Sequence, residues 1–139
     1  MRVSNAAVMH LNQLGLPVRG PRRSQQFYSA YFGFDPATAQ EHDDGTVIIR
    51  NADGFDLALH PVGQVEPSPA FLHAGFKAAE PAEVRALLDR MEADGVTIVE
   101  RNDEATYVAD PGRGFTRGGN LFTLAGCGTI SCGRPVGGM

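Results

Sequence analysis

The sequence predicts an α+β fold in which two βαβββ modules form a curved mixed sheet around a cup. Three observations predict it: a length of 139 residues, an internal repeat, and an apolar helical stripe at the same place in each repeat. This length suits one domain with a single core. We therefore expect one domain over residues 1–139, with module one at about 8–61, a connector at 62–69, module two at about 70–126 and a glycine-rich tail at 127–139.

The repeat has a period of 60 residues and holds over most of the two modules. Self-similarity of this kind fixes an architecture more firmly than local propensity does. The first-strand segment "QLGL" is echoed by "HAGF", and the proline before each helix recurs at the same offset. The helical positions that coincide are Ser24, Phe27, Tyr28 and Tyr31 with Val84, Leu87, Leu88 and Met91. Their spacing is that of a helix face that packs on a core.

In module one, the elements follow in the order strand, helix and three further strands. Residues 13–18 alternate between apolar and other side chains, which predicts a half-buried strand. Pro21 suits a first helical turn, and Gly33 suits the left-handed residue after a helix. Asp44-Gly45 predicts a type I′ hairpin turn into a strand at 46–50, and a second turn at 51–54 leads into a strand at 55–60.

Module two repeats this order less clearly toward its end. Its first strand contains His73, its helix runs from Pro81 to near Gly95, and residues 106–108 read as a strand. Nine of the 17 glycines fall after Asp110, and no acidic residue follows that position. This change in composition predicts a loop-rich or rearranged tail, with residues 120–125 as the only plausible last strand.

Strand alternation places three polar residues on one face of the sheet. Gln13 alternates with Leu14, Asp56 alternates with Leu57, and His73 lies on the face opposite its apolar neighbours. If the helices cover the apolar face, the side chains of Gln13, Asp56 and His73 project from the uncovered face. Each also has a plain structural interpretation: a half-buried histidine bonded to a backbone carbonyl, a strand amide that satisfies a neighbour, and a solvated carboxylate.

Charge and hydropathy exclude several classes of partner. The formal net charge is −4, so nothing attracts the protein to phosphate backbones and we expect no nucleic-acid partner. No apolar run approaches the roughly 18 residues of a membrane span, and no secretory signal is recognisable. We therefore expect a cytoplasmic protein with no membrane partner that binds a small molecule and forms a homodimer.

At this level the chain resembles the vicinal oxygen chelate superfamily, which contains glyoxalase I, bleomycin and fosfomycin resistance proteins and extradiol dioxygenases. The segments "GLPVRGPRRSQQFYSAYFGF" and "LHAGFKAAEPAEVRALLDRMEADGV" carry the resemblance, which covers residues 11 to about 110. It implies the glyoxalase/bleomycin resistance/dioxygenase fold. It also implies metal ligands at Gln13, Asp56 and His73, with His60 as the substitute for Asp56, and a divalent ion such as Ni, Zn, Mn or Fe.

The chain also departs from the family pattern. The resemblance implies a fourth ligand, a glutamate, on the last strand, but no acidic residue follows Asp110. Arg113 and Arg117 lie in that region, and we expect them to bind an anionic substrate or to lie on a loop. Two hypotheses follow, with no catalytic residue assigned in either. One is a metal-dependent lyase, isomerase or dioxygenase acting on a small oxygen-rich molecule. The other is a metal-free small-molecule or drug-binding protein of the resistance type, which needs no cofactor.

Overall fold

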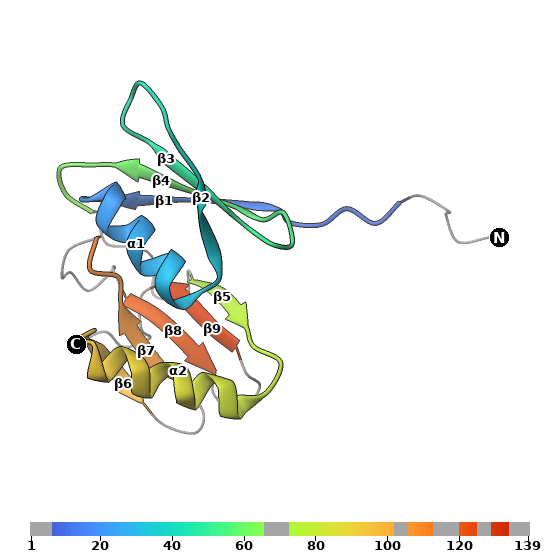
Figure 1. The fold of residues 1–139 in the computed structure, drawn as a ribbon, viewed down its shortest axis with the longest axis vertical. Helices are drawn as coiled ribbons and strands as arrows, with labels where there is room; N and C mark the ends of the chain where they lie inside the picture. The colour runs from blue at the N-terminus through green and yellow to red at the C-terminus, as the bar shows by residue number, and fades with distance from the viewer. Residues whose placement is uncertain (1–6, 66–72, 102–105, 113–119, 125–128, 134–139) are drawn as a thin grey trace.

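The computed structural model describes residues 7–65, 73–101, 106–112, 120–124 and 129–133. Its elements are β1 (Gln13–Val18), α1 (Pro21–Tyr31), β2 (Phe34–Glu41), β3 (Val47–Asn51), β4 (Asp56–Pro61), β5 (His73–Lys77), α2 (Pro81–Ala93), β6 (Ile98–Arg101), β7 (Thr106–Ala109), β8 (Asn120–Leu124) and β9 (Thr129–Gly133). The predicted α+β class and the two-module order are confirmed. In Figure 1, α1 lies between the two sheets and α2 lies over the second sheet.

Both helices begin and end where the sequence predicts. Each has proline in its first turn, where the missing N–H has no partner to lose. After each helix a glycine takes a left-handed backbone, with φ of +78° at Gly33 and +83° at Gly95. The predicted stripes face the core, since Tyr28 and Val84 are fully buried, together with Ser24, Phe27, Leu88 and Met91.

Sheet A has the strand order β1-β4-β3-β2, with β1 parallel to β4 and the other pairs antiparallel. One of its faces is apolar and buried; its side chains are Leu16, Val18, Val47, Ile49, Leu57 and Leu59. They join one core cluster with the buried residues of both helices. Since successive strand residues alternate between faces, the other face of sheet A carries the residues between them. Within the described part of the chain these residues are exposed or half-buried, and we name this the uncovered face.

The turn between β2 and β3 differs from its prediction. A type I′ turn requires a positive φ at both central residues, but among the described residues only glycines have one, and Gly45 has φ of +87°. The Gly45 N–H donates to the carbonyl of His42 at 2.9 Å. The Asp44 carboxylate accepts the Thr46 N–H at 2.9 Å. The prediction was wrong because this side-chain bond favours a right-handed Asp44, followed by a single left-handed glycine.

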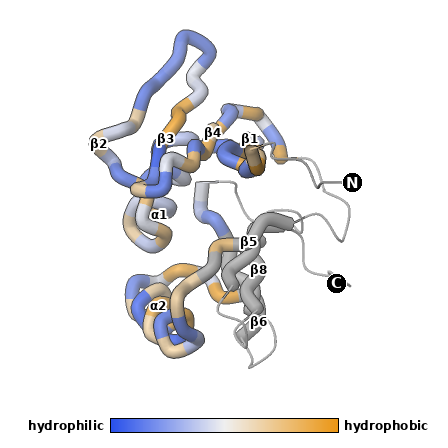
Figure 2. The backbone as a smooth tube through the Cα atoms, turned by 90° about the vertical axis from the view of Figure 1, so that its right-hand side faces the viewer, coloured by the Kyte–Doolittle hydropathy of each residue, from blue (hydrophilic) through white to orange (hydrophobic). Residues whose placement is uncertain are grey.

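Sheet B has the order β5-β9-β8-β7-β6, and all its pairs are antiparallel. The last strand predicted at 120–125 is observed as β8, but it is not the only strand of this region. β9 lies within the predicted tail and separates β5 from β8. The high glycine content of the whole tail concealed the short run Thr129–Gly133, whose threonine and isoleucine favour extended backbone. Figure 2 shows α2 on one side of the sheet B strands β5, β6 and β8.

Two of the sets of contacts that join the modules bear on the sites described below. The first is aromatic: the Phe76 ring of β5 lies 4.7 Å from that of Phe32 and 6.1 Å from those of Tyr28 and Phe34, between centroids. The second is the turn Asp110–Gly112, here named the D-P-G turn, which contacts the start of α1. Its Gly112 carbonyl accepts the backbone N–H groups of Arg19 and Gly20 at 2.9 and 2.7 Å.

In the described ranges, no helix is long and apolar enough to cross a bilayer.

The D-P-G turn is held by a buried carboxylate. Asp110 is 1% exposed, and its oxygens accept the Ser24 hydroxyl at 2.9 and 3.1 Å. The Gly112 N–H also donates to it at 2.8 Å. Because a buried carboxylate is costly unless it is hydrogen-bonded, these donors fix the turn against α1. The D-P-G turn therefore joins the modules.

Candidate functional site

The uncovered face of sheet A carries a row of polar side chains that crosses all four strands. Cα register pairs Asp35 of β2 with Arg50 of β3, Arg50 with Asp56 of β4, and Asp56 with Gln13 of β1. We name these four residues the polar row. Neighbouring strands lie about 4.8 Å apart, so adjacent side chains of the row are within reach of one another. Gln13, Asp35 and Arg50 are exposed and Asp56 is half-buried.

Arg50 and Asp56 form a two-point ion pair within this row. The Arg50 Nε atom lies 2.7 Å from Asp56 Oδ1, and its Nη2 atom lies 3.1 Å from Asp56 Oδ2. These hydrogen bonds, together with the charge of the guanidinium, lower the pKa of Asp56 below its ordinary 3.8. They also raise the pKa of Arg50. The side chains are 57% and 31% exposed, so solvent screens the pair and it contributes little to stability.

This ion pair predicts a change in titration. In an Arg50→Gln variant we expect the pKa of Asp56 to rise back toward 3.8, as measured by a carboxyl carbon NMR titration. Because the folded pKa is lowered, the pair stabilises the fold above the unfolded pKa, and this stabilisation is lost as the pH falls through the folded value. Asp44, whose pKa is lowered by the Thr46 N–H, serves as the control and should not change. An equal Asp56 midpoint in both proteins would mean that the pair does not form in solution.

A second row of residues lies next to the polar row, and two of its members, Ala58 and Gly15, are small. Cα register aligns Gln40, Ile48, Ala58 and Gly15 across the sheet. Toward the β2 edge, Thr38, Gln40, Ile48, Arg50 and Asp56 help to line a cleft of about 610 Å³. This volume is in the range of small-molecule sites, about 300–1,000 Å³. The uncovered face therefore has a polar row beside a second row that is apolar at Ile48 and small at Ala58 and Gly15.

His60 lies further along the same face. It pairs in register with Pro17, four residues along β4 from Asp56. Its Nδ1 atom lies 3.1 Å from the Thr46 hydroxyl. A Cβ atom at Gly15 would lie 3.1 Å from His60 Nε2, so the imidazole extends over that glycine. At about 3.3 Å per residue, His60 is roughly 13 Å along the strand from Asp56.

The structure brings together two of the predicted site residues, Gln13 and Asp56, which are register partners. The backbone of His73 lies in β5 and pairs with Gly133, but its side chain is outside the described part of the structure. Arg113 and Arg117 also lie outside the described residues. Among the side chains that are described, no group of three or more His, Cys, Asp and Glu is arranged to hold a metal ion.

Sequence reasoning missed Arg50 as a site residue. The signal was available, because Arg50 and Asp56 lie at opposite ends of the turn that joins β3 to β4. Residues that flank such a turn become cross-strand partners on one face. An arginine paired in this way with a predicted ligand changes what that ligand can bind.

Comparisons with known proteins agree with this fold. A family model described as Glyoxalase/Bleomycin resistance protein/Dioxygenase superfamily matches residues 10–124. A possible glyoxalase from Bacillus cereus is 22% identical, with a TM-score of 0.68 over 84% of this chain and 99% of that chain. A lactoylglutathione lyase from Agrobacterium tumefaciens is 15% identical, with a TM-score of 0.57 over 86% of this chain and 93% of that chain.

A third solved structure contains a metal. It is a mutant of the fosfomycin resistance protein FosX from Listeria monocytogenes, complexed with Mn(II) and 1S,2S-dihydroxypropylphosphonic acid. It is 15% identical, with a TM-score of 0.60 over 86% of this chain and 91% of that chain. At these identities the structures show the fold, and no curated protein sequence gives a significant match. The family model covers most of the chain, which therefore belongs to the Glyoxalase/Bleomycin resistance protein/Dioxygenase superfamily.

Proposed function

We propose that this protein binds a small oxygen-rich molecule on the uncovered face of sheet A. We also propose that a divalent cation on the same face takes part in binding this molecule. The observation that carries the proposal is the direct register of Gln13 with Asp56 on that face. An amide oxygen and a carboxylate on adjacent strands are donors that a divalent cation accepts. The same positions are the ligand positions that the family resemblance implies.

The described residues supply oxygen atoms of the kind that such a cation binds. They form only part of a metal site. Gln13 and Asp56 supply oxygen donors, and His73 is proposed as a third ligand from module two. A bound cation would polarise two neighbouring oxygens of the ligand and stabilise negative charge that develops on them. The protein's own residues would hold and orient that ligand against the polar row. The FosX structure, which holds Mn(II) with a diol-bearing ligand, supports this direction.

Arg50 competes with a cation for Asp56. Both carboxylate oxygens accept hydrogen bonds from its guanidinium, whose positive charge repels a second cation nearby. The competition is weak, because an exposed ion pair of this kind is screened by water and contributes little. We therefore expect a cation to displace Arg50 from Asp56.

Metal retention tests the proposal. The protein is dialysed against nickel, zinc, manganese or ferrous iron, and bound metal is measured by plasma mass spectrometry. We expect wild-type protein to retain about one ion, and Asp56→Asn and His73→Ala to bind at least about tenfold more weakly, which is the lower range for loss of a supporting group. Asp53→Asn, in the neighbouring turn, is the matched control. Retention that is equal in all four proteins would contradict the assignment of ligands.

Arg50→Gln sharpens the same experiment. If the guanidinium competes, this variant should bind the ion more tightly than wild type, by a small factor because the pair is exposed. Turnover of a 2-oxoaldehyde thiol adduct or of a catechol by metal-loaded protein would then assign the reaction class.

The Arg50–Asp56 pair also favours a second candidate, metal-free binding. If the pair persists, the N–H groups of Arg50 that do not bond Asp56 are free to donate to ligand oxygens, with the Gln13 amide beside them. The protein would then sequester an oxygen-rich molecule by hydrogen bonds alone. Wild-type and Arg50→Gln proteins that both retain no metal would favour this candidate.

A further inference from the structure

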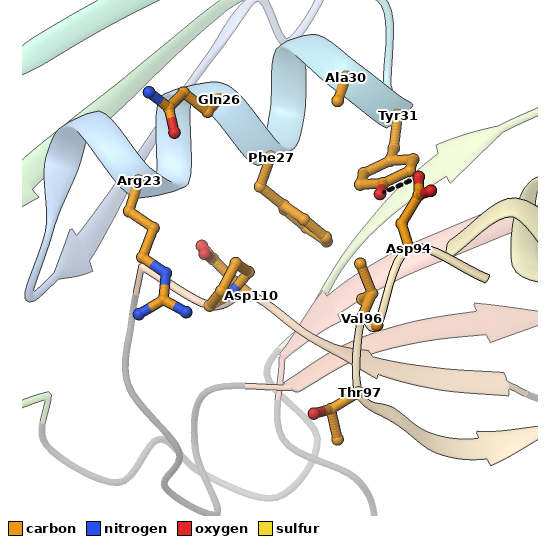
Figure 3. Close-up of a pocket in the computed structure, with 11 residues that line it drawn as sticks. Arg23, Gln26, Phe27, Ala30, Tyr31, Asp94, Val96, Thr97 and Asp110 are labelled. Carbon is orange, nitrogen blue, oxygen red and sulfur yellow. Dashed lines mark hydrogen bonds between the residues drawn. The ribbon is translucent and has the colours of Figure 1, made fainter. Parts of the chain in front are cut away.

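A second cleft lies at the junction of the two modules, on the helix side of sheet A and away from the polar row. It has a volume of about 580 Å³. One wall is a single face of α1, formed by Arg23, Phe27 and Tyr31 at a spacing of four residues. The opposite wall comes from the segment between α2 and β6 and from the D-P-G turn, as Figure 3 shows.

One end of this cleft carries an exposed arginine near the buried Asp110 carboxylate. Figure 3 shows the Arg23 side chain extending from α1 toward the D-P-G turn. Arg23 is exposed, and within the described residues it takes part in no hydrogen bond or ion pair. Its neighbour Arg22 differs, because it pairs with Glu41 at 3.5 Å. An arginine of this kind at the mouth of a cleft is a binding point for a carboxylate or another oxyanion.

The middle of the cleft is apolar and its far end accepts hydrogen bonds. Phe27 and Val96 line the middle, as Figure 3 shows. At the far end the Tyr31 hydroxyl donates to Asp94 Oδ2 at 2.7 Å. Burial, together with this bond, raises the pKa of Tyr31, so the hydroxyl stays protonated. Because the Asp94 carboxylate would repel a second anion, the ligand must be neutral at this end. A hydroxyl or amine group there would donate a hydrogen bond to Asp94.

The two ends are a fixed distance apart. Arg23 and Tyr31 are eight residues apart on α1, which corresponds to about 12 Å along the helix axis. The D-P-G turn is fixed to α1 by the buried Ser24–Asp110 bonds, so this wall is preformed. Small-molecule sites occur preferentially at such junctions, with apolar walls and a few polar groups that set orientation.

We propose that the junction cleft is a second binding site, for a flat aromatic monocarboxylate that carries a hydrogen-bond donor at its far end. Its carboxylate pairs with Arg23, its ring packs on Phe27 and Val96, and its donor bonds Asp94. The site is separate from the uncovered face of sheet A and does not depend on the function proposed there.

The test uses 6-hydroxy-2-naphthoate, which has a carboxylate and a hydroxyl at opposite ends of a two-ring system. Binding is measured by titration calorimetry, and the site is mapped from backbone amide shifts in NMR spectra. We expect the shifts to centre on Arg23, Phe27 and Val96, and the affinity to fall about tenfold in Arg23→Gln, as for loss of a charged hydrogen bond. Arg22→Gln removes the same charge one residue away and should bind like wild type. Uncharged 2-naphthol should bind at least about tenfold more weakly.

Several results would overturn the proposal. They are the absence of binding, equal losses in Arg22→Gln and Arg23→Gln, equal affinity for 2-naphthol, and amide shifts that centre on the polar row. Arg50→Gln separates the two sites, because it changes the face of sheet A and should leave naphthoate binding unaltered.

Discussion

Replacement of Gly112 by alanine is expected to lower the free energy of unfolding by about 3 kcal/mol or more, as measured by urea denaturation. An added Cβ would lie 2.0 Å from the Ser24 Oγ atom, 2.4 Å from the Ser24 backbone nitrogen and 2.7 Å from the Gly20 carbonyl oxygen. Two of these atoms belong to the backbone at the start of α1. The clash can therefore be relieved only by separating the D-P-G turn from the helix, which would also break the bonds to the Gly112 carbonyl.

Gly63→Ala is the matched control for this variant. No atom lies within 4 Å of a Cβ built there, so its unfolding free energy should stay within about 0.5 kcal/mol of wild type. Removal of the Ser24 hydroxyl in a Ser24→Ala, Gly112→Ala double variant should not restore stability, because the backbone contacts remain. If Gly112→Ala is as stable as wild type, the D-P-G turn does not dock on α1 as the structure shows.

Replacement of Phe34 by alanine is expected to destabilise the protein by about 3–5 kcal/mol, the usual loss for a buried phenylalanine. Phe34 is 1% exposed at the start of β2. Its ring lies 6.3 Å from that of Tyr28 and 6.1 Å from that of Phe76, between centroids. The substitution would leave a cavity where the two modules meet. The midpoint temperature of thermal unfolding and the midpoint urea concentration should therefore both fall.

Leu11→Ala tests whether the loss arises from burial. Leu11 is 85% exposed, so the same type of truncation there should change stability by less than about 0.5 kcal/mol. A Phe34→Leu variant keeps most of the volume and should lose much less than the alanine variant. Equal losses in Leu11→Ala and Phe34→Ala would contradict the placement of Phe34 in the shared core.

The fold was predictable because its evidence is distributed along the chain. The prediction used the repeat, the helical stripes and the glycines after each helix. These signals involve many residues, so one irregular position could not change the predicted fold. The turn at Asp44 could not be predicted in the same way, because its type depends on the local bond between the Asp44 carboxylate and the Thr46 N–H. β9 was missed because the glycine content of a long segment outweighed a five-residue run in which the threonine and isoleucine favour a strand.

The shared face of two candidate residues was predictable, but the ion pair that one of them makes was not. Alternation placed Gln13 and Asp56 on one face, and the parallel register of β1 and β4 made them neighbours. The pairing of Asp56 with Arg50 depends on how the two strands align across the turn between them. The junction cleft could not be predicted, because it requires α1 and the α2 to β6 segment to face each other, and no local pattern encodes that arrangement.

The bond between Ser24 and Asp110 also bears on how the chain folds as it is made. These residues are 86 positions apart. At translation rates of about 5–20 residues per second, α1 waits roughly 4–17 s after its own synthesis before the turn that completes its contacts emerges. During that interval the aromatic residues of module one lack their Phe76 partner for part of the time. We therefore expect the yield of native protein in cells to depend on chaperone supply more steeply than its final stability would suggest.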